Sequence, residues 1–182
     1  MITILDYGVG NIHSFVTMFK RLNVPVQTAR SIEDLSGASK LILPGVGAFD
    51  HAMKLLSEKK LTSPLKKFAE NKNKFILGIC VGMQLLANSS EEGNEIGLGL
   101  IPGRVKKFKK AKILPHVGWN SISPIKNNKL FNNIEENAKF YFLHSYYFDN
   151  SKHILVNNSE PLNLLKIKHK NIQKPPIISK DI

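Results

Sequence analysis

The chain has 182 residues, 42% of them hydrophobic, and this length and apolar share predict one domain with a substantial core. No apolar run approaches the roughly 20 residues that span a bilayer, and residues 1–6 lack the features of a signal peptide. The lone cysteine excludes an internal disulfide. We therefore expect a cytoplasmic protein without a membrane segment. The formal net charge of +12 suggests a nucleic-acid partner, but lysines far outnumber arginines and asparagine and isoleucine are abundant, so we attribute the charge to compositional bias and expect no such partner.

Short apolar runs alternate with helical patterns along the first part of the chain. Residues 1–5 predict a buried strand that ends in a glycine-rich turn at 6–11, and Ile12, Phe15 and Phe19 recur at helical spacing, so a helix is expected over 11–22. Strands that alternate with helices are typical of an α/β fold, a parallel sheet with helices on both faces. The further elements expected up to the cysteine are strands at 24–28, 40–43 and 75–79 and helices at 48–57 and 63–70.

Turns that contain glycine follow strands at 6–11, 44–47 and 78–82. Because ligand chemistry in parallel sheets gathers at the carboxyl ends of the strands, we expect these turns at one edge of the sheet. The turn at 6–11 lacks the third glycine of a dinucleotide fingerprint, which disfavours a nucleotide site. The histidines show no His-Glu-x-x-His spacing, and one cysteine cannot build a structural zinc cluster. We therefore expect neither a cofactor nor a metal.

The lone cysteine lies in the sequence Gly78-Ile79-Cys80-Val81-Gly82, between the strand at 75–79 and a helix expected at 83–87. Glycines two positions on either side suit a sharp strand-to-helix turn, in which a nucleophile is held in a strained conformation and its neighbours must lack a Cβ atom. The following helix N-terminus is expected to favour the thiolate. The pattern predicts a nucleophile elbow with cysteine in place of serine.

A thiol nucleophile needs an oxyanion hole and a base. The glycines of Pro44-Gly45-Val46-Gly47 could let backbone N–H groups point into the site, although an ordinary strand-to-helix turn has the same residues. The base is normally a histidine oriented by a third polar group. His116 and His144 stand in strand-like, aromatic surroundings, and for both we favour a structural role at a turn or strand end.

Beyond residue 97 the pattern changes to strands linked by turns, expected at 105–108, 113–117 and 140–148, which predict an antiparallel extension. The dense basic cluster at 106–110 is interpreted as a solvated strand end or turn. A phosphate-binding patch and docking onto an acidic protein surface are the alternatives.

The motifs together resemble a known family, the glutaminase subunit of imidazole glycerol phosphate synthase, a class I (triad-type) glutamine amidotransferase. The resemblance covers residues 1 to about 156 and implies a flavodoxin-like three-layer sandwich. The blocks that carry it, in this order, are Asp6-Tyr7-Gly8-Val9-Gly10-Asn11, Leu43-Pro44-Gly45-Val46-Gly47, Gly78-Ile79-Cys80-Val81-Gly82-Met83-Gln84-Leu85-Leu86, Gly97-Leu98-Gly99-Leu100-Ile101-Pro102-Gly103, Pro115-His116-Val117-Gly118-Trp119-Asn120 and His144-Ser145-Tyr146-Tyr147.

The resemblance implies a chemistry for the elbow. Cys80 would attack the side-chain amide of glutamine, giving a glutamyl thioester and ammonia. The main chain at Gly45, Val46 and Gly47 would supply the oxyanion hole, after a peptide flip induced by the partner. Val81 replaces the leucine usual in the family, which is a mild apolar exchange.

The resemblance also implies how substrate and partner are bound. Gln84, Ser145 and Tyr146 would help to hold glutamine. Asn11 and Trp119 would lie near the interface with a (β/α)8-barrel cyclase subunit, in a heterodimer that uses the ammonia in histidine biosynthesis. Paralogous pairs that supply ammonia in surface-polysaccharide sugar biosynthesis are an alternative. A cysteine hydrolase of another class, acting without a partner, is a weaker one.

The C-terminus departs from the family pattern, in which a His-Pro-Glu segment closes the triad. Lys170-Asn171-Ile172 resembles the approach to that segment, but no His-Pro-Glu occurs, and neither His153 nor His169 matches its surroundings. We therefore interpret 1–182 as one amidotransferase domain with an atypical, truncated or frameshifted tail at 157–182 that lacks a strong strand pattern. A pseudo-enzyme that keeps the partner-binding surface is the alternative. In either case we expect little or no glutamine hydrolysis from this chain.

Overall fold

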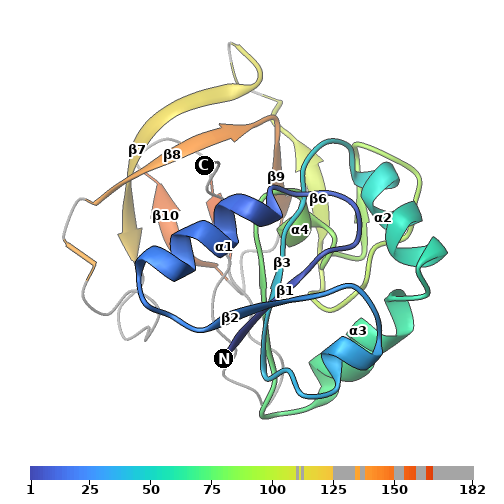
Figure 1. The fold of residues 1–182 in the computed structure, drawn as a ribbon. Coiled ribbons are helices and arrows are strands. Elements are labelled where there is room, and N and C mark those ends of the chain that lie inside the picture. Colours follow the sequence, from blue (N-terminus) through green and yellow to red (C-terminus); the bar gives the residue numbers. More distant parts are fainter. Residues whose placement is uncertain are drawn as a thin grey trace.

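The computed structural model describes residues 1–109, 111, 113–124, 134–135, 138–149, 154–158 and 163–165. A four-stranded sheet in the order β2-β1-β3-β4 forms its centre (Figure 1). The pairs within this sheet are all parallel, as the alternation of strands and helices predicts. Its strands are β1 (Ile2–Leu5), β2 (Val26–Ala29), β3 (Lys40–Leu43) and β4 (Phe75–Gly78).

Helices cover both faces of the central sheet, which confirms the three-layer α/β prediction. Successive strand residues point to opposite faces, and in β1 this sends Ile4 to a cluster with Phe15 of α1. Leu5, on the other face, joins the large core that includes Leu56 and Leu65 of the second and third helices. The helices are α1 (Ile12–Arg21), α2 (Phe49–Glu58), α3 (Thr62–Glu70) and the single-turn α4 (Val81–Gln84), with a short 3-10 helix at Glu33–Leu35.

Strands after residue 88 form two further sheets, with mostly antiparallel pairs. One has the order β5-β6-β9, and the other has the order β11-β10-β7-β8. The first contains β5 (Ser89–Ser90), β6 (Arg104–Lys107) and β9 (Tyr146–Asp149). The second contains β7 (His116–Pro124), β8 (Lys139–His144), β10 (Ile154–Asn158) and β11 (Asn163–Leu165).

The structure corrects several predicted boundaries. The single strand expected at 140–148 is broken at Ser145, because β8 pairs with β7 whereas β9 pairs with β6 in another sheet. The strand expected at 113–117 begins only at His116, since Pro115 has no amide hydrogen to donate to a ladder. In the segment 157–182, expected to lack a strong strand pattern, β11 pairs with β10; the rest of that segment lies outside the described residues apart from the end of β10.

None of the described helices is both long and apolar enough to cross a lipid bilayer.

Candidate active site

Cys80 forms a sharp turn between β4 and α4. Its backbone has φ 53° and ψ −124°, a left-handed conformation that is unfavourable for a residue with a side chain. The flanking glycines are needed for space: a Cβ atom at Gly78 would lie 2.6 Å from the Met83 Cα, and one at Gly82 would lie 2.0 Å from the Leu43 carbonyl oxygen. The geometry is that of the predicted nucleophile elbow, with a partly exposed thiol that is in no disulfide.

The helix after the elbow is shorter than expected. The sequence predicts a helix over 83–87, but α4 spans Val81–Gln84 and the chain then turns. The backbone N–H groups of Met83 and Gln84 already donate to the Cys80 carbonyl oxygen, at 3.0 and 3.4 Å. A single turn has a weak dipole, so it stabilises a thiolate less than the predicted longer helix.

The loop at 44–47 packs directly against the elbow. A Cβ atom at Gly45 would lie 2.3 Å from the Gly82 nitrogen, so the two turns meet through their backbones. Gly47 has φ 84°, and the Val46 side chain is exposed. Within the described part of the chain, no hydrogen bond is donated by the amides of Gly45, Val46 or Gly47. Backbone donors are therefore available beside the thiol; their use as an oxyanion hole stays a prediction.

Tyr7 lies in one of the glycine-rich turns, and the sequence pattern does not mark it as a site residue. Its side chain is fully buried, and its hydroxyl donates to the Pro44 carbonyl oxygen at 2.8 Å. Burial raises the pKa of the Tyr7 phenol strongly, and the negative charge that nearby Cys80 carries when ionised raises it further. The phenol therefore stays protonated and acts as a hydrogen-bond donor over the whole physiological pH range.

The predicted glutamine-binding residues lie at the end of α4, between β8 and β9, and at the start of β9. Gln84 is 7% exposed, and among the described residues its side-chain oxygen Oε1 has no hydrogen-bond partner. Tyr146 packs partly buried against the same core as Cys80. Burial raises the pKa of Tyr146, with smaller contributions from Glu92 and Glu91. Ser145 accepts a hydrogen bond from the Phe108 amide through its carbonyl oxygen at 3.1 Å.

A pair of carboxylates that sequence reasoning missed ties α2 to the loop at 91–95. The Glu92 Oε2 accepts from the Phe49 amide at 3.0 Å. In return, the Asp50 oxygens accept from the amides of Asn94 and Glu95, at 3.0 and 2.9 Å. These hydrogen bonds lower the pKa of Asp50. No local sequence pattern indicates this clamp, because its partners are more than 40 residues apart in the sequence.

The candidate histidines lie opposite each other in the β7–β8 ladder. His116 pairs in register with His144, and their rings are 5.8 Å apart. Phe108 stacks edge-on against His144, whose Nδ1 lies 3.0 Å from the Tyr146 carbonyl oxygen. These contacts belong to an aromatic cluster and fit the structural role favoured for both histidines. His153, His169 and the residues that follow Ile172 lie outside the described residues.

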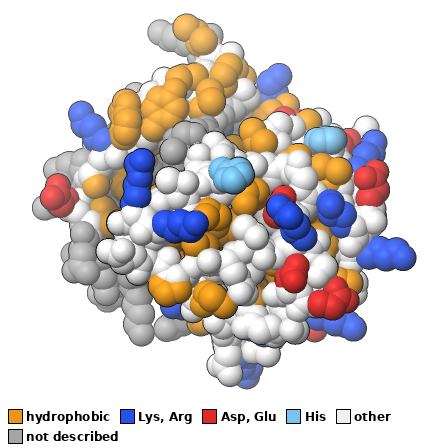
Figure 2. All heavy atoms as spheres, in the orientation of Figure 1, with side chains coloured by type: hydrophobic (Ala, Val, Ile, Leu, Met, Phe, Trp, Pro, Cys, Tyr) orange, Lys and Arg blue, Asp and Glu red, His pale blue; other side chains and the backbone are white. Residues whose placement is uncertain are grey.

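The residues predicted at a partner interface are both exposed. Asn11 accepts from the Ser14 amide at 3.2 Å and so caps α1. Trp119 is 64% exposed on β7, and its ring lies 5.6 Å from that of Tyr141 on β8. Val117 and Leu143, which pair with each other on the same two strands, are also exposed. Figure 2 shows hydrophobic side chains gathered at the upper left, over the region that Figure 1 assigns to these strands.

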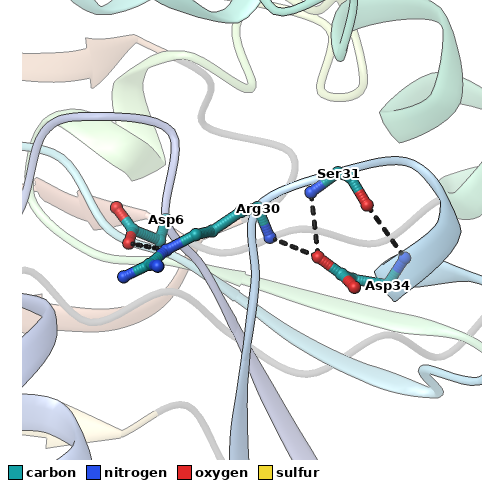
Figure 3. A network of polar contacts seen from close by, with 4 residues as sticks. All are labelled: Asp6, Arg30, Ser31 and Asp34. Carbon is teal, nitrogen blue, oxygen red and sulfur yellow. Dashed lines mark hydrogen bonds and ion pairs between the residues drawn. The ribbon is translucent and has the colours of Figure 1, made fainter.

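A polar network joins the residues that follow the carboxyl ends of β1 and β2 in the central sheet (Figure 3). The Arg30 Nε donates to Asp6 Oδ2 at 2.8 Å. Asp34 Oδ2 accepts from the amides of Arg30 and Ser31, at 2.8 and 3.0 Å, and these hydrogen bonds lower the pKa of Asp34. The network holds the start of the turn that contains Tyr7.

Comparisons with known proteins identify relatives of this chain. A family profile described as "Glutamine amidotransferase class-I" matches residues 3–177. The protein named "Imidazole glycerol phosphate synthase subunit HisH" from Bdellovibrio bacteriovorus is 50% identical over 154 residues, which is 82% of this chain and 76% of that protein. The protein of the same name from Leptospira borgpetersenii is 48% identical over the same shares.

Solved structures share the fold at low sequence identity. A crystal structure of a glutamine amidotransferase superposes with a TM-score of 0.73 at 17% identity, covering 98% of this chain and 87% of that one. A putative GMP synthase component from Thermoplasma acidophilum superposes with a TM-score of 0.67 at 20% identity, covering 98% and 81%.

Proposed function

Because the chain belongs to the class I glutamine amidotransferase family, we propose that it is the glutaminase subunit of an imidazole glycerol phosphate synthase. The observation that carries the proposal is the strained Cys80 packed against a loop with available backbone amides. Relatives at up to 50% identity bear the name of that subunit, which supports glutamine as the substrate. A chain with one cysteine cannot form an internal disulfide, which suits a reducing compartment, and we propose the cytoplasm on that ground.

The proposed reaction begins with attack of the Cys80 sulfur on the side-chain carbonyl carbon of glutamine. The carbonyl π electrons move to oxygen, and the amides of Gly45, Val46 and Gly47 are the proposed donors to that oxyanion. One such donor is typically worth roughly 10²–10³ in rate. Collapse breaks the C–N bond, and the nitrogen takes a proton and leaves as ammonia. Water then hydrolyses the glutamyl thioester to glutamate and restores the thiol.

The substrate is proposed to lie between α4 and the β8–β9 bend. The Gln84 Oε1, which has no described partner, is the proposed acceptor on the α4 side, and Ser145 and Tyr146 are proposed to border the substrate on the other side. Glu92 adds negative charge near Tyr146, which suits the α-ammonium group of an amino acid.

The partner is proposed to be the (β/α)8-barrel cyclase subunit, which would consume the ammonia. The exposed apolar side chains of Val117, Trp119 and Leu143 give the β7–β8 face the aromatic and aliphatic character of an interface core. Asn11 lies in the turn that also contains Gly10, and a Cβ atom at Gly10 would lie 2.8 Å from the Pro44 Cβ. An interface at Asn11 would therefore lie close to the 44–47 loop.

The proposed turnover also depends on a base. The thiol proton must be accepted and later delivered to the leaving nitrogen, which a histidine does in a triad. The sequence contains no His-Pro-Glu segment, and the described contacts of His116 and His144 lie within the aromatic cluster. General-base assistance is worth roughly 10²–10⁴ in rate. For a chain of these residues we therefore propose slow hydrolysis.

The test is reconstitution of the chain with the barrel subunit from Bdellovibrio bacteriovorus. We expect co-elution of the two proteins in size-exclusion chromatography and a slow release of glutamate from glutamine that Cys80→Ser abolishes. Mass spectrometry detects the glutamyl thioester on Cys80. Co-elution with neither glutamate release nor this thioester would establish a non-catalytic binding module instead. Absence of both a complex and a glutamyl adduct on Cys80 would refute the proposed function.

A further inference from the structure

Tyr7 makes a long-range contact that the proposed reaction does not use. The residue follows β1 directly and its side chain is fully buried, yet its hydroxyl reaches the Pro44 carbonyl oxygen at 2.8 Å. A buried hydroxyl is unfavourable unless it is hydrogen-bonded, and a phenylalanine would fill the same space without that requirement. The hydroxyl therefore points to a function of the hydrogen bond itself.

The Pro44 carbonyl and the Gly45 amide belong to one planar peptide group. In a trans peptide the C=O and N–H bonds point in opposite directions, so a donor that fixes the carbonyl also fixes the amide. Gly45 is the first of the proposed oxyanion donors. We infer that Tyr7 is a positioning residue, whose hydroxyl holds the Gly45 amide in one orientation beside Cys80. The catalytic part of this inference rests on the proposed function.

The loop needs such an anchor because its own residues permit several conformations. Gly45 and Gly47 lack the side chains that restrict backbone rotation, and Gly47 already has a positive φ. Packing prevents translation of the loop: Gly10 contacts Pro44 on one side, and Gly45 contacts the Gly82 nitrogen on the other. Translation is therefore blocked by sterics, whereas rotation of the Pro44–Gly45 peptide is opposed by the Tyr7 hydrogen bond.

The decisive experiment observes the Gly45 amide directly by NMR. Labelling proline at the carbonyl carbon with ¹³C and glycine with ¹⁵N selects Pro-Gly pairs, and the sequence contains only Pro44-Gly45 and Pro102-Gly103. Tyr7→Phe removes the hydroxyl alone. We expect the Gly45 cross-peak to move and the Gly103 cross-peak to stay, which also shows that the variant is folded. A Gly45 cross-peak that does not move overturns the inference.

Kinetics of the complex with the barrel subunit test the consequence for catalysis. Tyr7→Phe misorients one donor rather than deleting it, so we expect kcat to fall about tenfold with KM for glutamine within about twofold. Tyr147→Phe makes the same chemical change on a ring stacked against Phe108, and it should leave kcat unchanged. An unchanged kcat in Tyr7→Phe, when the unaltered complex is active, overturns the positioning role.

A measurement on the unaltered chain covers the case in which Tyr7→Phe does not fold. With tyrosine labelled by ¹³C at Cζ, a slowly exchanging hydroxyl gives separate Cζ signals in an equal mixture of H2O and D2O. We expect this doubling for Tyr7, and a single averaged signal overturns the inference. If the unaltered complex releases no glutamate, the proposed function fails by its own test, while the two NMR measurements still decide whether Tyr7 holds the Gly45 peptide.

Discussion

Substitution of Gly82 by alanine tests the close approach of the elbow to the 44–47 loop. The new Cβ atom would lie 2.0 Å from the Leu43 carbonyl oxygen, 2.8 Å from the Leu43 carbonyl carbon and 2.8 Å from the Pro44 carbonyl carbon. All of these atoms belong to the backbone at the end of β3, so no side-chain rotation can relieve the overlap. Either the elbow or the central strand must shift.

The cost can be estimated from the effect of overpacking. Extra methyl groups in well-packed cores typically destabilise by about 1–3 kcal/mol, and here the yielding atoms are backbone, so we expect a loss of about 3 kcal/mol or more. That is a large share of the roughly 5–15 kcal/mol by which domains are stable. Gly37→Ala is the matched control, because a Cβ atom there meets nothing within 4 Å. Its effect should stay within about 0.5 kcal/mol.

The assay is urea unfolding monitored by far-UV circular dichroism. Equal dependence of the free energy on urea concentration in the variants and the natural chain shows that their free energies of unfolding can be compared. A Gly82→Ala variant that loses less than about 1 kcal/mol would refute the reasoning, because backbone overlap of this kind cannot be absorbed so cheaply. The same conclusion would follow if Gly37→Ala and Gly82→Ala were equally destabilised.

Further substitutions test Gln84, the Asp50 clamp and the β7–β8 face. Gln84→Met removes a buried oxygen that has no described partner, so the free energy of unfolding should be unchanged or rise by about 1 kcal/mol while glutamine binding, measured by calorimetry, weakens; a large loss of stability would contradict this. Asp50→Asn should destabilise more than Asp34→Asn, because both oxygens of Asp50 accept backbone hydrogen bonds whereas a single oxygen of Asp34 does. Since the pKa of Asp50 is lowered in the fold, the natural chain should exceed Asp50→Asn in free energy of unfolding by the full difference at neutral pH. This difference should shrink as the pH falls below the ordinary value of 3.8, and acid titration of the unfolding midpoint checks it. An unchanged difference at low pH would exclude the clamp as its source. Trp119→Ala should weaken binding to the barrel subunit more than tenfold in a titration while the unfolding midpoint of the lone chain stays the same; equal affinity would remove the β7–β8 face from the interface.

The sequence predicts best where local pattern and tertiary context agree. Lys40–Leu43 is a strand both in the sequence prediction and in the structure, because a short apolar run before Pro44 allows few alternatives. The β8–β9 region shows the opposite case: a continuous aromatic and apolar run indicates one strand, but Ser145 separates partners in different sheets, and partner choice is a long-range property. The helix after Cys80 ends early for a similar reason, since its residues are buried in the main core on both sides of the turn.

The candidate site follows the same division. Cys80 and the 44–47 loop could be predicted because glycine spacing directly reports the backbone geometry they need. The hydrogen bond from Tyr7 to Pro44 and the carboxylate clamp of Asp50 and Glu92 could not, because they join residues 37 or more positions apart. Such contacts depend on which turns the fold brings together, and no local pattern in a single sequence indicates which distant turns become neighbours.

The position of Trp119 has a spectroscopic consequence. It is the only tryptophan of the chain, and it stands largely in solvent on the β7–β8 face rather than in the core. The intrinsic emission of the protein therefore begins near the wavelength of a hydrated indole and reports the surroundings of one surface. Loss of the core by denaturant should change that emission little, whereas a protein that covers the face should shift it to the blue, so the fluorophore built into this chain observes docking rather than folding.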